Sequence, residues 1–100
     1  MRESTLEKAI VKYARSRGCL TYKFVSPQNR GVPDRIFIGP TGTVLFMEIK
    51  APGKKPTALQ SRTIHEIMGH LGNAVWVDNL EKAVSCIDYF CILEEFKPDV

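Results

Sequence analysis

Cysteine is scarce in this sequence of 100 residues, and its placement argues against disulfides and zinc sites. The three cysteines, Cys19, Cys86 and Cys91, are odd in number and widely spaced, which indicates reduced thiols. The two histidines, His65 and His70, lie five residues apart on an expected helix, so they do not share a face as an i, i+4 metal pair would.

Long hydrophobic runs are absent as well. No segment approaches the roughly 18 apolar residues that a membrane-spanning helix needs, and the N-terminal sequence MRESTLEK lacks the apolar region of a signal peptide. We therefore expect a soluble, cytoplasmic protein with no membrane partner.

A large excess of one charge is also missing. The net charge of +3, from 14 Lys and Arg against 11 Asp and Glu, suits a nucleic-acid partner but is not specific to one.

What the sequence does contain is the composition of one globular domain. Its residues are 44% hydrophobic and 25% charged, which favours folding over disorder. A chain of this length forms one core. We expect a single domain over residues 1–100, with its core at about 4–93 and a short C-terminal tail.

Hydrophobic periodicity and turn signals predict an α/β fold with the element order α-β-β-β-α-β-α, in which helices flank a mixed sheet. The spacing of a capping box occurs at Ser4 and Glu7 and again at Thr57 and Gln60, and Asp78 is expected to cap the last helix. The predicted helices cover residues 4–18, 57–71 and 78–91, and the predicted strands cover 19–25, 34–38, 44–50 and 74–77.

The two central strands read as a β-hairpin that brings charged residues together. If its loop spans residues 39–43, antiparallel register places Asp34 across from Glu48, with Cβ atoms roughly 5 Å apart. Strand alternation puts Lys50 on the same face. A slip of one residue would separate the three side chains, so the prediction depends on this loop.

Two carboxylates this close repel each other unless a positive charge lies between them. A hard divalent cation such as Mg²⁺ supplies that charge, and it commonly binds one or two carboxylates together with water and a substrate phosphate. Lys50 would then lie against the phosphate or the attacking water. The alternative is a surface ion pair of Glu48 and Lys50, with Asp34 in a turn.

Pro33-Asp34 followed by Glu48-Ile49-Lys50 resembles the PD-(D/E)-x-K motif of the restriction-endonuclease-like nucleases. Over about residues 4–90 the wider pattern resembles the VRR-NUC family of that superfamily. Its other elements here are Glu7, Lys23-Phe24, Gly31-Val32-Pro33-Asp34-Arg35 and Gln60.

The resemblance implies a restriction-endonuclease-like core and a nuclease that hydrolyses DNA phosphodiesters with Mg²⁺, for which Mn²⁺ can substitute. By this resemblance Asp34, Glu48 and the Ile49 backbone carbonyl are metal ligands, and Lys50 is catalytic.

Two further residues join the catalytic set through the resemblance. It implies that Glu7 approaches the metal through water and that Gln60 helps to position the site. Each also has a structural explanation, because each stands at the third helical position of an expected capping box.

Relatives of this length resemble homodimeric four-way (Holliday) junction resolvases of phages and bacteria, which serve DNA repair and recombination. The resemblance therefore implies a phage-encoded or bacterial endonuclease that acts on branched DNA. Two alternatives stay open. One is a restriction-type, flap or nicking nuclease subunit of a larger assembly, and the other is a non-catalytic nucleic-acid-binding module.

Basic residues near the hairpin end are candidates for DNA contact. Arg30 precedes Asp34 in a loop, and Lys54 and Lys55 follow Lys50 in another. Cations of this kind give affinity for phosphates without reading sequence. Arg35 points to the face opposite Asp34, where a helix is as good a partner as a phosphate.

Two apolar features complete the sequence reading. Trp76 lies in a short apolar strand and is expected in the core. An apolar stretch near the C-terminus includes Tyr89, Phe90, Ile92 and Leu93, and it predicts either ordinary packing or a homodimer surface. Two arginines late in the expected first helix, Arg15 and Arg17, are expected to act as favourable charges at the C-terminal end of that helix.

Overall fold

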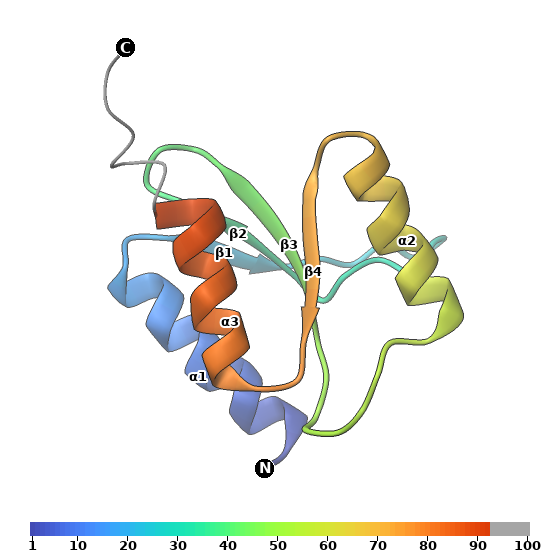
Figure 1. The fold of residues 1–100 in the computed structure, drawn as a ribbon, viewed down its shortest axis with the longest axis horizontal. Helices are drawn as coiled ribbons and strands as arrows, with labels where there is room; N and C mark the ends of the chain where they lie inside the picture. The colour runs from blue at the N-terminus through green and yellow to red at the C-terminus, as the bar shows by residue number, and fades with distance from the viewer. Residues whose placement is uncertain (93–100) are drawn as a thin grey trace.

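The computed structural model describes residues 1–92, which form a mixed four-stranded sheet with helices on both faces (Figure 1). The strand order is β1-β2-β3-β4, with antiparallel pairing except between β3 and β4, which are parallel. The elements are α1 (Glu3–Ser16), β1 (Leu20–Lys23), β2 (Arg35–Ile38), β3 (Val44–Ile49), α2 (Ala58–Gly69), β4 (Asn73–Val77), α3 (Leu80–Ile87) and a π-helical turn η1 (Asp88–Ile92). The predicted α/β element order is confirmed.

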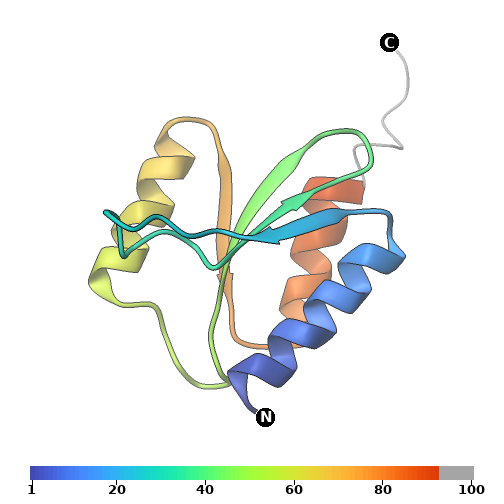
Figure 2. The ribbon, with the colours of Figure 1, turned by 180° about the vertical axis from the view of Figure 1, so that it is seen from behind.

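Helices α1 and α3 cover one face of the sheet, and α2 lies on the other side, next to β4 (Figures 1 and 2). Strand alternation explains the main core, because every second side chain of β2 and β3 faces α1 and α3. The fully buried side chains of this layer include Phe37, Leu45, Met47 and Ile49 from the sheet and Leu6, Ile10 and Ile87 from the helices.

All three helices begin at the end of the sheet where β3 and β4 terminate (Figure 1). The parallel pairing of β3 and β4 requires this for α2, which crosses back between them. Helix N-termini carry partial positive charge and unpaired backbone N–H groups. This end of the sheet is therefore suited to anions.

The β2–β3 hairpin has the register that the sequence predicts. Ile38 pairs with Val44 and Ile36 pairs with Phe46. Within the loop, the Gly39 N–H donates to the Thr43 carbonyl at 2.8 Å. Gly42 has a φ of +95°, in the left-handed region that glycine adopts without a steric penalty.

The helix starts agree only in part with the predicted caps. The box formed by Thr57 and Gln60 is present at the start of α2. The box predicted at Ser4 is wrong, because α1 begins at Glu3 after the extended residue Arg2, which makes no side-chain capping bond. Ser4 is thus already helical and cannot take the non-helical conformation of a cap.

The cap predicted for the third helix is displaced by one residue. Asn79, not Asp78, adopts the extended N-cap conformation, and its side chain accepts from the Lys82 N–H at 2.8 Å. The Asp78 carboxylate instead accepts hydrogen bonds from the Asn79 side chain and from the Gly53 N–H. Asp78 therefore connects the end of β4 to the loop after β3.

The apolar C-terminal stretch is explained largely by packing. Ile92 is buried in the main core and Phe90 packs against it, whereas Tyr89 is 65% exposed. Leu93, the last member of the predicted stretch, lies outside the residues that the structure describes.

Trp76 is half-buried, which corrects its expected core position. It lies on the edge strand β4, where the Lys82 ammonium sits 4.3 Å from its ring centroid. Within residues 1–92, no helix is long and apolar enough to cross a bilayer.

Candidate active site

The end of the β2–β3 hairpin brings Asp34 and Glu48 together. Arg35 pairs with Met47, so continuing the register by one residue places Asp34 opposite Glu48. The Asp34 carboxylate oxygen Oδ2 accepts a hydrogen bond from the Ile49 backbone N–H at 2.9 Å. This bond fixes the Asp34 side chain at the carboxyl end of β3.

Glu48 is a buried acid with one unsatisfied oxygen. Its relative exposure is 1%. Oxygen Oε2 lies 3.2 Å from the Lys50 Nζ, whereas Oε1 is buried and has no hydrogen-bond partner among the described residues. Because a buried polar atom without a partner is costly, this oxygen is available to bind a water or a metal ion.

The surroundings of Glu48 favour its protonated form. The pKa of Glu48 is raised to about 7, first by burial of the carboxyl and then by repulsion from the Asp34 carboxylate. The hydrogen bond and charge of Lys50 act in the opposite direction. A cation bound between the two carboxylates would remove the conflict and stabilise both in their charged forms.

The donor set suits a hard divalent cation. Asp34 and Glu48 offer carboxylate oxygens, and the Ile49 carbonyl follows Glu48 directly. Across residues 1–92, no group of three or more His, Cys, Asp or Glu side chains could hold an ion by itself. An ion at Asp34 and Glu48 would therefore need the carbonyl, water or a substrate phosphate as further ligands, which is the ordinary pattern for Mg²⁺.

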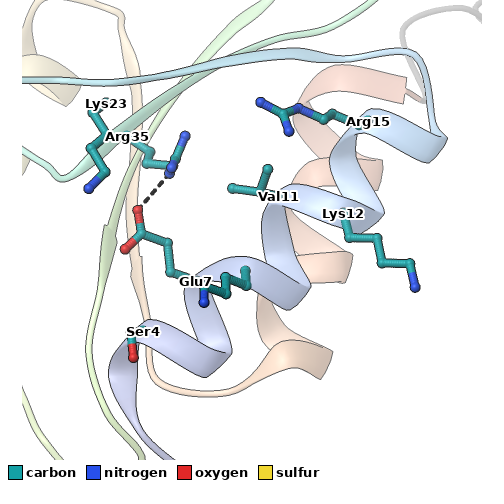
Figure 3. A pocket seen from close by; sticks show the side chains of 8 residues that line it. Ser4, Glu7, Val11, Lys12, Arg15, Lys23 and Arg35 are labelled. Atoms are coloured by element: carbon teal, nitrogen blue, oxygen red, sulfur yellow. Dashed lines mark hydrogen bonds and ion pairs between the residues drawn. The ribbon is translucent and has the colours of Figure 1, made fainter.

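The structure pairs Glu7 with Arg35. The Arg35 Nε donates to the Glu7 Oε2 at 2.7 Å, and this ion pair joins α1 to β2 (Figure 3). Arg35 thus has the helix partner that sequence reasoning considered for it. The predicted role of Glu7, a water-mediated contact with the metal, remains a prediction.

Gln60 uses its side-chain oxygen in the α2 cap. Its Oε1 accepts from the Thr57 N–H at 2.9 Å, and its own N–H donates to the Thr57 Oγ1 at 3.2 Å. An amide side chain has one oxygen and one NH₂ group. Any contact that Gln60 makes with the active site would therefore come from its side-chain amide nitrogen, Nε2.

The predicted DNA-contacting loop residues are exposed. Arg30 lies beside Gly31, which approaches α2 so closely that a Cβ there would meet Leu59. Lys54 and Lys55 lie in the loop between β3 and α2. These cations flank α2, and their contact with DNA remains a prediction.

Sequence reasoning missed several cations that gather around α1. They line a cavity of about 540 Å³ with Arg35 and Glu7 (Figure 3). The signal in the sequence was the spacing of basic residues along the first helix, which places them on one face. Lys23 is part of the family pattern and Arg15 is expected as a helix-end charge, but sequence reasoning gave neither of them a DNA-contact role. It did not consider the other two cations of the cavity, Lys8 and Lys12.

The fold and one relative identify the family. No family model matches the chain. A solved structure of a VRR-NUC domain superposes with a TM-score of 0.81 over 89% of this chain and 97% of that chain, at 23% identity. "Putative nuclease p44" of Acyrthosiphon pisum secondary endosymbiont phage 1 is 48% identical over 77 residues, which are 77% of this chain and 82% of that protein.

This chain belongs to the family of that phage protein. Its fold is that of the solved VRR-NUC domain, with which it shares nearly the whole arrangement of sheet and helices. The resemblance noted from the hairpin motif is thereby confirmed at the level of family and fold. In this VRR-NUC chain, the motif residues Asp34, Glu48 and Lys50 meet at the end of the hairpin.

Proposed function

We propose that this VRR-NUC protein is a divalent-metal-dependent endonuclease that hydrolyses DNA phosphodiesters. The observation that carries the proposal is the buried Glu48 oxygen Oε1, which lacks a partner among residues 1–92 although Asp34 and Lys50 are close by. A purely structural ion pair would not require a second carboxylate beside an unsatisfied oxygen. A metal-binding site does require a second carboxylate there, since the bound cation would neutralise both carboxylates and give the unsatisfied oxygen a partner.

Each residue of the trio has a distinct role in this proposal. Mg²⁺ or Mn²⁺ bound by Asp34 and Glu48 supplies charge neutralisation for the phosphate and activation of a water. The Ile49 N–H orients Asp34, so that this carboxylate is held in place before substrate arrives. Lys50 is partly exposed beside Glu48, so its ammonium can neutralise charge on a phosphate oxygen.

The substrate we propose is branched DNA, with a homodimer making paired cuts in a four-way junction. Two sites related by a two-fold axis suit two symmetric cuts. The edge strand β1 exposes two large apolar side chains, Leu20 at 56% and Tyr22 at 58%, which a dimer could bury. Junction preference and dimerisation otherwise rest on the family resemblance.

One experiment tests the activity and the substrate together. Four-way junction, flap, duplex and single-stranded DNA are offered side by side, with Mg²⁺, with Mn²⁺ and with a chelator. We expect metal-dependent cleavage, with the junction cut fastest. Preferential cutting of flaps or duplex would favour a different nuclease role, and binding without any cleavage would favour the non-catalytic module.

The oligomeric state is measured on the same preparation by sedimentation. We expect a dimer at the concentration used for cleavage. Paired cuts made by a strict monomer would contradict the proposed two-fold arrangement.

A further inference from the structure

The cavity against α1 concentrates positive charge. Five of its eight lining residues are cations and one, Glu7, is an anion, a local balance of +4. The whole chain carries a net charge of +3. The cavity therefore carries more net positive charge than the chain as a whole.

Three of these cations form a row along the helix. Lys8, Lys12 and Arg15 are spaced by four and three residues, so they lie on one face of α1, and all three are exposed. At 1.5 Å per residue the row spans about 10 Å. Phosphates of one DNA strand advance about 3.4 Å each along the duplex axis, so the row is long enough to contact more than one of them.

The floor of the cavity is held in place by the sheet. Arg35 is largely buried, with a side-chain exposure of 14%, and it binds Glu7. Lys23 is its partner in the β1–β2 register, which adds a cation beside it. In Figure 3, Arg15 reaches from α1 toward Arg35, whereas Lys12 points away from Arg35 on the outer side of the helix.

The basic surface adjoins the candidate active site. Arg35 directly follows Asp34 in the chain, and the Asp34 carbonyl accepts from the Phe24 N–H, one residue after Lys23, at 2.8 Å. Because successive side chains of a strand point to opposite faces, Asp34 and the cavity lie on opposite sides of the sheet at the same end. A DNA strand would contact both by passing around this end of the sheet.

We propose that Lys8, Lys12, Arg15 and Lys23 bind consecutive backbone phosphates of the DNA that flank the phosphodiester to be cleaved. This inference rests on the proposed nuclease function and adds a substrate-binding surface to it. The cations extend along the helix rather than converging on one point, which favours a polyanion over a single phosphate ion. Such contacts position DNA by its backbone and carry no sequence preference.

The test measures DNA affinity against salt concentration for the full-length protein, in chelator so that no cleavage occurs. The variant K8Q/K12Q/R15Q removes the three exposed cations of the row. The slope of log K against log salt is negative, and each lost phosphate contact makes it shallower by about 0.9. We therefore expect the magnitude of the slope to fall by up to about 2.7 in this variant. The charge-preserving variant K8R/K12R/R15K should retain the wild-type slope, because the three positive charges remain.

A matched control separates local contacts from overall charge. R2Q/R17Q/R62Q removes the same three charges from exposed residues outside the cavity, and its slope should stay close to that of the wild type. Equal slopes for the two triple variants would overturn the proposal. A second result would also overturn it: inorganic phosphate at millimolar concentration displaces DNA from the wild type, while K8Q/K12Q/R15Q keeps the wild-type slope. That result would identify a site for a single anion.

Wild-type cleavage of the same DNA with Mg²⁺ distinguishes the two proposals. Cleavage with unchanged slopes would overturn the phosphate-binding surface alone. A changed slope without cleavage would overturn the nuclease function while supporting the DNA-binding surface. Thermal melts of each triple variant confirm that the comparison is between folded proteins.

Discussion

The carboxylate of Asp34 accepts a hydrogen bond from the backbone N–H of Ile49, at 2.9 Å, across the end of the β2–β3 hairpin. This contact joins two residues 15 positions apart in sequence and places the Asp34 side chain next to Glu48. The orientation of one acid thus depends on the backbone that carries the other. Substitutions at either position must therefore separate the loss of charge from the loss of this hydrogen bond.

Asp34→Asn makes that separation. Asparagine keeps an oxygen that can accept from the Ile49 N–H, so we expect the unfolding free energy to change by less than about 1 kcal/mol. The loss of a metal ligand should lower the single-turnover cleavage rate by about 100-fold or more. Chemical denaturation and a cleavage time course check the two parts. A variant that cleaves at the wild-type rate would refute the role of Asp34.

The raised pKa of Glu48 predicts how stability depends on pH when metal is removed by a chelator. The carboxyl has a pKa of about 7 in the folded protein and an ordinary value near 4.5 when unfolded. Between these values the folded state holds more protons, so stability falls as pH rises, by up to about 1.4 kcal/mol per pH unit. Below pH 4.5 and above pH 7 this contribution is constant.

Denaturation curves between pH 4 and pH 8 measure the effect. Glu48→Gln is the control, because a neutral amide should flatten this part of the profile. Added Mg²⁺ should stabilise the wild type more at pH 7 than at pH 5, since the ion binds the charged carboxylate. Identical profiles for the wild type and Glu48→Gln would argue against the pKa shift.

Lys50→Ala should separate catalysis from metal binding. The ammonium lowers the pKa of Glu48, so its removal should shift metal binding to higher pH without abolishing it. The single-turnover rate should still fall by about 100-fold at a pH where the metal site is filled. Calorimetric titration with Mn²⁺ at pH 7 and pH 8.5 measures the first part. Complete loss of binding at both pH values would mean that Lys50 has a structural role.

Thr57 and Gln60 allow a test of whether Gln60 acts beyond the helix cap. Both belong to one capping box, so Thr57→Ala and Gln60→Ala should each cost about 1 kcal/mol of stability. If Gln60 also positions the active site, only its replacement should reduce the cleavage rate. Equal rates in the two variants would leave Gln60 with the cap alone.

Gly39 tests how closely the hairpin approaches the C-terminal turn. A Cβ at this position would meet the backbone carbonyl oxygen of Cys91 in η1, and backbone cannot move aside easily. Gly39→Ala should destabilise the protein by about 1–3 kcal/mol. Gly69→Ala is the matched control, because a Cβ there meets no atom within 4 Å, and the change should be neutral or stabilising by up to about 1 kcal/mol. Equal melting temperatures would refute the close approach.

Local patterns were sufficient for much of the fold. Alternation in two adjacent strands and a Gly-rich loop predicted the register of Ile36 with Phe46. Threonine and glutamine three residues apart predicted the cap of α2. The same rule failed at Ser4, because a capping residue must be extended and the sequence does not reveal that the helix already starts at Glu3.

The sequence by itself determined the meeting of Asp34 and Glu48, because hairpin register depends on neighbouring residues and on strand alternation. Only the tertiary structure decided that Glu48 is buried with an unsatisfied oxygen, and that Glu7 binds Arg35. It also decided that the basic face of α1 meets Lys23. These features depend on how a helix packs across a sheet, and that packing is set by contacts between residues far apart in the chain.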